Sequence, residues 1–163
     1  MGNHVEIVLI FVVIVTLAIS AQAATYSGGT GTEIDPYQIG TVSDWTMLMT
    51  TSADWNKNFI LNEDIDFQGA ALTPIGTSMA VYFSGKFDGK GHVLRTGQIN
   101  LPTSSDVGLF GCVLSGEIRN LGVERFTVTS NKYRVGCLVG QNHGTVTSCY
   151  ANGEVTGSSS YAG

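Results

Sequence analysis

The sequence predicts an all-β protein in which short strands stack as the coils of a β-solenoid, with one short helix near the N-terminus. Three observations support this fold class. Of the 163 residues, 21 are glycine and only 13% are charged, about twice and about half of the usual shares. Similar short segments recur about every 24–28 residues, and no helical periodicity follows the single helix candidate. A fixed period of this length in short strands indicates stacked coils rather than a sandwich.

The N-terminal segment, residues 1–23, is predicted to be a signal peptide. Ile7–Ile19 is a run of 13 residues in which only Thr16 is polar, and residues 21–23 (Ala-Gln-Ala) have the small-x-small pattern of a cleavage site. Such a run is too short to span about 30 Å of hydrocarbon. An uncleaved N-terminal anchor is the alternative, because the apolar stretch can be extended to Ala24. We expect export, either as a secreted or as a cell-surface protein.

Charge and motif content exclude several classes of function. There are 8 basic and 13 acidic residues, for a net charge of −5, and no cluster of Lys or Arg. Phosphate affinity comes mainly from grouped cations, so no nucleic-acid partner is expected and a membrane is met only through the N-terminal segment. The Gly-rich stretch Ser27–Thr32 lacks the Lys and the following helix of a phosphate-binding loop. No cofactor is therefore expected.

Residues 24–92 are predicted to form an entry region that caps the first coil. Thr41 and Asp44 have the spacing of a helix capping box, and apolar residues follow at helical spacing. We therefore expect one short helix at about residues 42–51. Strand-like runs flanked by Asn, Asp and Gly follow at residues 58–61, 65–67 and 82–87.

Residues 93–163 are predicted to form the repeating part of the solenoid. Gly108 and Gly136 have the same spacing as Gly116 and Gly144, whereas the matching apolar pairs upstream lie closer together in the sequence. Glycines are expected at the coil corners, where φ is positive or a Cβ would clash. Equivalent aliphatic side chains should stack in three inward columns, namely Leu94 with Ile118 and Val146, Ile99 with Val123, and Val128 with Val155.

The second repeat, residues 134–153 (RVGCLVGQNHGTVTSCYANG), resembles the GLUG-motif family of bacterial surface and secreted proteins, and residues 106–123 are a weaker copy. The resemblance implies a right-handed parallel β-helix, commonly within long adhesin-like proteins. Some IgA-specific metallopeptidases carry the motif, but no His-Glu-x-x-His occurs here, so that activity is not expected. Cys137, Ser148 and Gly97 depart from the usual pattern. Because residues 158–163 only open a third copy, we expect a truncated sequence of a longer parent protein.

Three acidic residues of one segment and one further Asp are the candidates for metal binding or catalysis. Glu63, Asp64 and Asp66 could ligate calcium, but they also fit a strand end whose acids face water. Asp88 could belong to the carboxylate pair of a glycosidase, although Asp-Gly is first a turn signal. The sequence therefore leaves open a β-helical polysaccharide lyase or glycosidase that uses Asp64, Asp66 or Asp88.

The histidines and cysteines are not expected to form a metal site. His92 and His143 belong to coils about 10 Å apart, and no Cys-x-x-Cys pair occurs. The cysteines are odd in number: Cys112, Cys137 and Cys149. Both a Cys137–Cys149 disulfide and three small buried thiols are compatible with the sequence.

Tyr133, Tyr150 and Tyr161 are the candidate binding residues, because they lie near repeated corners and a Tyr ring can stack on a sugar or a protein. Tyr150 could equally belong to the core, since it lies in a strand-like run. With no catalytic constellation, the sequence favours a non-catalytic exported segment of a larger protein, acting as a rigid scaffold or an adhesin-like surface. Its expected partner is a glycan or a surface protein.

Overall fold

The computed structural model describes residues 25–158, so the predicted signal peptide, Tyr161 and the start of the third repeat lie outside the described residues. The described chain forms ten strands, one α-helix and one 3-10 helix. In chain order these are β1 Tyr37–Ile39, α1 Val42–Thr50, η1 Ser52–Asp54, β2 Asn58–Leu61, β3 Ile65–Asp66, β4 Lys86–Asp88, β5 Val93–Arg95, β6 Gln98–Asn100, β7 Phe110–Arg119, β8 Gly122–Thr129, β9 Val139–Thr147 and β10 Tyr150–Thr156.

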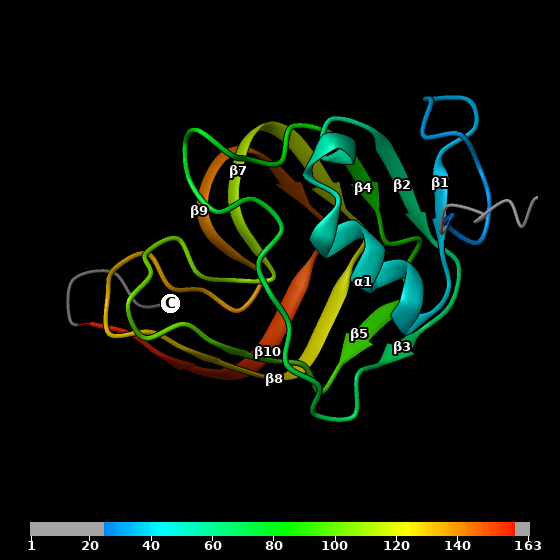
Figure 1. Cartoon of the computed structure of the whole chain (residues 1–163). Helices are drawn as coiled ribbons and strands as arrows, with labels where there is room; N and C mark the ends of the chain where they lie inside the picture. The colour runs from blue at the N-terminus through cyan, green and yellow to red at the C-terminus, as the bar shows by residue number, and fades with distance from the viewer. Residues whose placement is uncertain (1–24, 159–163) are drawn as a thin grey trace, which may run out of the picture.

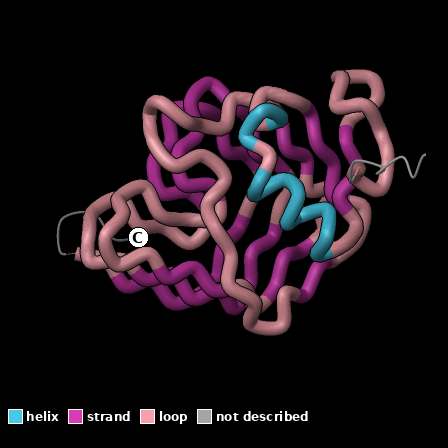
Figure 2. Tube along the Cα trace, viewed as in Figure 1, coloured by secondary structure: helices cyan, strands magenta, loops and turns pink. Residues whose placement is uncertain are grey.

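The strands form two parallel sheets, and after β2 each coil contributes to both of them. One sheet has the order β1-β2-β4-β7-β9 and the other β10-β8-β5-β3, with β6 paired to the second half of β8. Every pair of neighbouring strands is parallel, and loops close each turn on the third side (Figures 1 and 2). This is a β-solenoid of about four turns with one short helix, which confirms the predicted fold class.

Strand register confirms one of the three predicted columns in full and a second in part, and it corrects the rest. Ile118 stacks on Val146, and Val128 stacks on Val155. However, Leu94 belongs to the other sheet, where it stacks on Val123. The prediction that placed Leu94 and Ile118 in one column is therefore wrong.

The partners of Ile99 and Ile118 in the neighbouring coils also differ from the predicted ones. Ile99 stacks on Val128 rather than on Val123. The residue that stacks on Ile118 from the preceding coil is Phe87 of β4. The spacing of equivalent positions along the chain is longer in the sheet of β4 and β7 than in the sheet of β5 and β8. This difference arises because the corner between β4 and β5 is longer than the corner between β7 and β8.

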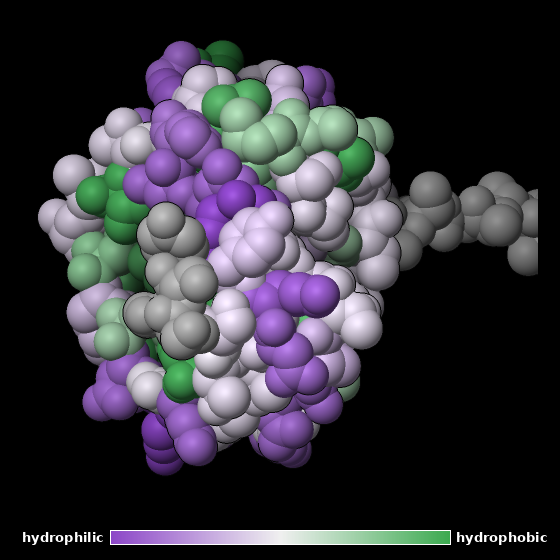
Figure 3. Space-filling model, turned by 90° about the vertical axis from the view of Figure 1, so that its left-hand side faces the viewer, coloured by the Kyte–Doolittle hydropathy of each residue, from purple (hydrophilic) through white to green (hydrophobic). Residues whose placement is uncertain are grey.

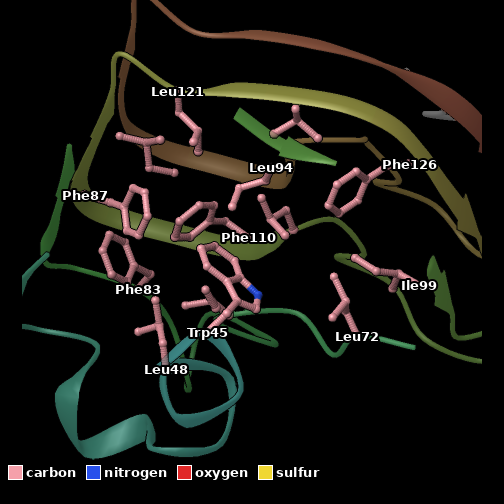
Figure 4. Packing of buried hydrophobic residues seen from close by; sticks show 14 of the residues in the cluster. Trp45, Leu48, Leu72, Phe83, Phe87, Leu94, Ile99, Phe110, Leu121 and Phe126 are labelled. Atoms are coloured by element: carbon pink, nitrogen blue, oxygen red, sulfur yellow. The ribbon is translucent and has the colours of Figure 1, made fainter. Parts of the chain in front are cut away.

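The core is aromatic on the side of α1. Phe59, Phe83, Phe87 and Phe110 are fully buried on the inner side of one sheet. Trp45 from α1 packs edge-on against two of these rings, with ring centroids 5.7 Å from Phe87 and 6.4 Å from Phe110. Figure 4 shows Trp45 reaching from α1 toward these rings. The helix therefore packs against the core through Trp45 and Leu48 and leaves its other face exposed.

The helix begins at the predicted capping box. Thr41 Oγ1 accepts a hydrogen bond from the Asp44 N–H, and Asp44 Oδ2 accepts one from the Thr41 N–H. Asp44 also accepts hydrogen bonds from Gly40 and from the backbone and hydroxyl of Ser27. Burial opposes ionisation of Asp44, but these hydrogen bonds outweigh it and hold its pKa below the usual range. One carboxylate therefore fixes both the helix start and residues 25–36, which precede β1 and are called the entry segment below.

In the repeating part, residues 93–158, the positions with positive φ are occupied by residues other than glycine. Asp106 and Arg134, at equivalent positions of successive coils, have φ of 60° and 58°, and Asn120 and Ser148 have 53° and 52°. Positive φ in the repeats is thus adopted by stacked side-chain-bearing residues, which corrects the expectation that glycines make these turns. The glycines instead lie where coils touch. At Gly144, a Cβ would come within 2.2 Å of the backbone oxygen of the glycine beside it in the preceding coil.

Candidate functional site

Tyr150 is exposed on the outer surface of the solenoid and is not part of the core. It is the first residue of β10, and 52% of its surface is accessible. A Cβ added to Gly122 would lie 2.7 Å from the Tyr150 ring, so the ring lies directly over the Gly122 backbone on the neighbouring strand. The Tyr150 hydroxyl donates a hydrogen bond of 2.7 Å to Glu124. The ring is thus held flat and half-exposed.

Tyr133 lies at the other end of the same sheet. It follows β8 in a loop, is 44% exposed, and carries the Arg134 guanidinium 4.6 Å above its ring. Arg134 in turn donates to Asp106 of the preceding coil, over 3.0 Å from Nη2 to Oδ2. Tyr150 pairs with the first residue of β8, whereas Tyr133 lies beyond its last residue. The structure therefore does not bring Tyr133 and Tyr150 together.

A row of polar side chains, which the sequence did not predict, leads to Tyr150. Arg95 donates from Nη1 to Asp64 over 2.8 Å and from Nε to Glu124 over 3.1 Å, and Glu124 accepts from Tyr150. His92 Nδ1 lies 3.2 Å from Asp64 Oδ1. We call Asp64, His92, Arg95, Glu124 and Tyr150 the polar row. Its members come from the neighbouring strands β5, β8 and β10 and from the residues directly before β3 and β5.

Electrostatics in the polar row favours the charged forms. Hydrogen bonds from Arg95 and from the Val93 N–H hold the pKa of Asp64 below its usual range. The hydrogen bonds from Tyr150 and Arg95 lower the pKa of Glu124. The same two carboxylates raise the pKa of the Arg95 guanidinium. Opposite charges in contact thus stabilise one another's ionised forms, so Asp64, Arg95 and Glu124 remain paired ions at neutral pH.

The carboxylates considered for catalysis are held as paired anions. Asp88 accepts hydrogen bonds from Asn120 over 3.0 Å and from Arg119 over 3.1 Å. Burial raises the pKa of Asp88, but the hydrogen bonds outweigh it and the pKa is lowered. The hydrogen bond from Thr96 lowers the pKa of Asp66 as well. A general acid requires a raised pKa, so neither carboxylate is tuned for that role.

Candidate metal ligands are dispersed among residues 25–158. No three His, Cys, Asp or Glu side chains are grouped there so as to hold a metal ion. His92 lies beside Asp64, whereas His143 lies on β9 of the other sheet, beside Gln141.

All three cysteines are free thiols, so the alternative of a Cys137–Cys149 disulfide is not realised. Cys112 and Cys137 are buried, and Cys149 is half-buried. Burial raises the pKa of Cys137 to about 11 and shifts the pKa values of the other two upward. A thiol with a raised pKa is a weak nucleophile, so these side chains act as small hydrophobic groups.

The surface of the repeating end is of mixed polarity. On the face shown in Figure 3, hydrophilic side chains are interspersed with weakly polar ones, and the apolar areas are small and separate. Within the described part of the chain, the helices are all too short or too polar to cross a membrane.

No protein-family model matches the chain, and no solved structure matches it at a significant level. The chain is 30% identical over 156 residues to halomucin of Haloquadratum walsbyi, a match that covers 88% of this chain and 2% of halomucin. It is also 30% identical over 135 residues to a Gly-rich membrane protein of Evansella cellulosilytica, covering 77% of this chain and 15% of that protein. The chain thus spans a small part of these relatives, and neither is named as an enzyme. The resemblance to GLUG-motif repeats stays a prediction.

Proposed function

We propose that this chain is a non-catalytic β-solenoid segment of a larger exported protein, and that it serves at the cell surface or outside the cell as a rigid scaffold with an adhesin-like binding surface. The observation that carries the proposal is the stacking itself. Successive coils are joined by parallel strands in both sheets, and Asp64 and Asp88 are bound by Arg95 and Asn120 of the next coil. Such an arrangement suits a rigid scaffold that presents a binding surface rather than a site of acid–base catalysis.

The relatives support the same role. Matches that cover 2% and 15% of the relatives' length fit a segment repeated or embedded in much longer proteins. One relative is named a membrane protein, which supports a place at the cell boundary. The resemblance of residues 134–153 to GLUG-motif repeats points to the same class of surface and secreted proteins.

The binding surface that we propose is centred on Tyr150. Its ring lies flat over Gly122 and leaves one face to solvent, while Glu124 fixes the hydroxyl. A sugar ring can stack on such an aromatic face, and the charges of the polar row beside it can accept and donate hydrogen bonds. A glycan or a surface protein is therefore the proposed partner, and Tyr133 would form a second contact point at the far end of the sheet.

The binding test compares the full 163-residue chain with Tyr150→Ala on arrays of glycans and matrix proteins. Tyr150→Phe retains the ring and is the matched control, and Tyr133→Ala reports on the second contact point. We expect Tyr150→Ala to weaken binding about fivefold, since an aromatic contact contributes about 0.5–1.5 kcal/mol. Equal binding by the wild type and Tyr150→Ala would refute the placement of the surface.

The catalytic alternative has its own assay. Wild type and Asp88→Asn are incubated with a panel of polysaccharides, and reducing ends and unsaturated products are measured. We expect no release above the buffer control for either protein. Release by the wild type that Asp88→Asn abolishes would overturn the non-catalytic role and establish a polysaccharide-degrading enzyme.

A further inference from the structure

A groove of about 690 Å³ lies at the opposite end of the described solenoid from Tyr150, between the entry segment and the outer face of α1. The entry segment is fastened to the helix by Ser27, whose N–H and hydroxyl both donate to Asp44. Gly28 of the entry segment also forms an antiparallel bridge with Gln38 of β1. The walls of the groove are thus fixed by hydrogen bonds. Its volume lies within the range of about 300–1,000 Å³ of small-ligand sites.

The lining of the groove is rich in hydroxyl groups. Ser43, Thr46 and Thr50 of α1 line one wall, and Thr25, Thr30 and Thr51 also line the groove. Thr46 and Thr50 donate their hydroxyl protons to the helix carbonyls of Val42 and Thr46, over 2.8 and 2.9 Å. Their oxygen lone pairs therefore remain free to accept hydrogen bonds from a ligand.

The base of the groove combines aromatic faces with a single carboxylate. Tyr26 and Tyr37 pack together with ring centroids 4.4 Å apart, and Met47 adds an apolar side chain. The Tyr26 hydroxyl donates to Asp54 Oδ2 over 3.0 Å. Burial and the Asp54 charge raise the pKa of Tyr26, so this hydroxyl stays a donor and Asp54 Oδ1 remains available as an acceptor.

The charge of the lining limits the class of ligand. Asp54 is the sole acidic side chain on the groove, and the described residues that line it include no Lys, Arg or His. A phosphate or carboxylate ligand would therefore lack a cation and face a negative charge. An aliphatic ligand would remove Asp54 Oδ1 from water without offering it a hydrogen-bond donor, which costs about 1–3 kcal/mol for an unsatisfied group.

We propose that the groove between the entry segment and α1 binds a neutral saccharide. The hydroxyls of a sugar donate to Thr46, Thr50 and Asp54, and its C–H face packs against Tyr37 and Met47. This site is separate from the surface around Tyr150, which lies in the last described coil. The inference therefore goes beyond the proposed function and can fail independently of it.

The test is a titration of the full chain with chitohexaose, cellohexaose, mannohexaose and laminarihexaose, followed by backbone amide shifts in NMR. At about 10 mM sugar, a site with a dissociation constant of about 1 mM is about nine-tenths occupied. We expect at least one hexaose to shift the amides of Tyr37, Ser43 and Thr46. The absence of such shifts with all four sugars would overturn the proposal, as would shifts confined to the surface around Tyr150.

Two groove variants and one control separate binding from folding. Thr46→Val removes a hydroxyl at constant shape and should weaken binding about threefold. Asp54→Asn keeps an acceptor for Tyr26 but removes the charge, and should weaken binding about tenfold. Thr127→Val makes the same change as Thr46→Val on an exposed strand position and should leave the affinity unchanged. Equal affinities for all three variants, with wild-type circular dichroism, would refute the site.

Discussion

Gly111 offers the sharpest test of close stacking between coils. It lies in β7, where an added Cβ would come within 2.1 Å of the Gly76 oxygen, 2.5 Å of the Asp106 oxygen and 2.9 Å of the Pro74 Cβ. Two of these atoms are backbone, so no side chain can rotate away. An ordinary contact of 3.4 Å would need the two segments to separate by about 1 Å or more. We therefore expect Gly111→Ala to be strongly destabilising.

The magnitude follows from the hydrogen bonds that such a movement breaks. Gly111 N–H donates to Ile75 over 2.9 Å, and Cys112 N–H donates to Gly76 over 3.2 Å. Lengthening both by about 1 Å takes them beyond hydrogen-bonding distance. Overpacking costs about 1–3 kcal/mol, and each lost hydrogen bond about 1 kcal/mol. The expected loss is about 3–5 kcal/mol, a large part of the roughly 5–15 kcal/mol that stabilises a folded protein.

The assay is urea unfolding of the full chain, followed by tryptophan fluorescence and circular dichroism. With a slope of about 2 kcal/mol per molar urea, the midpoint of Gly111→Ala should fall by about 2 M. Gly40→Ala is the matched control, because a Cβ at Gly40 has no neighbour within 4 Å and φ is not positive there. That change should raise stability by a few tenths of a kcal/mol to about 1 kcal/mol. Equal midpoints for the two variants would refute the close stacking of coils at Gly111.

Two further predictions concern the helix and the aromatic core. Asp44→Ala should lower stability at pH 7 by about 2 kcal/mol, because Asp44 caps α1 and accepts from Ser27. Folding lowers the pKa of Asp44, so this stabilisation is present above the ordinary pKa near 4 and is lost as pH falls through the pKa of the folded state. The urea midpoints of wild type and Asp44→Ala should therefore converge in acid. Phe87→Ala, at a fully buried ring, should cost about 3–5 kcal/mol by the same assay. The exposed control Ile34→Ala should change stability by less than about 0.5 kcal/mol, and a comparable loss in both would contradict the burial of Phe87.

Local signals in the sequence predicted the elements well. The capping box at Thr41 and Asp44 predicted the helix start at Val42, and the apolar run within residues 58–61, with Asn and Asp nearby, predicted β2 at its observed bounds. These signals are local because a cap or a strand is decided by residues within a few positions of one another. The expected strand at residues 82–87 is shorter than predicted, since β4 covers only Lys86–Asp88 and Phe83 forms an isolated bridge.

The columns could not be predicted in the same way, because they depend on the lengths of corners. Leu94 and Ile118 are both buried aliphatic residues in short strands, so hydrophobicity alone does not say that they belong to different sheets. Four residues separate β4 from β5, whereas two separate β7 from β8. The predicted partner Ile118 is 24 residues from Leu94, whereas the observed partner Val123 is 29 residues away, so the coil here is longer than the 24–28 residues that the sequence indicates.

The polar row likewise depends on strand register, which the sequence does not specify. Asp64, Arg95 and Glu124 come from three successive coils, and they meet only because the strands beside them are in one register. A shift of one residue would turn each side chain to the opposite face of the sheet. Composition did indicate that charges are few, but only the register shows that these charges pair with one another. The groove between the entry segment and α1 likewise depends on a contact between Ser27 and Asp44. These residues are distant in the sequence, and no local pattern specifies their contact.

Close stacking also restricts where this chain can acquire a binding function. At Gly144, as at Gly111, the neighbouring coil leaves no room for even one carbon atom. The interior columns are filled by aliphatic and aromatic side chains such as Phe87 and Ile118. Ligands must therefore be met on the outer face of the sheets or at an end of the solenoid. Tyr150 occupies the first kind of position and the groove beside α1 the second, so binding there can change while the stacked interior stays the same.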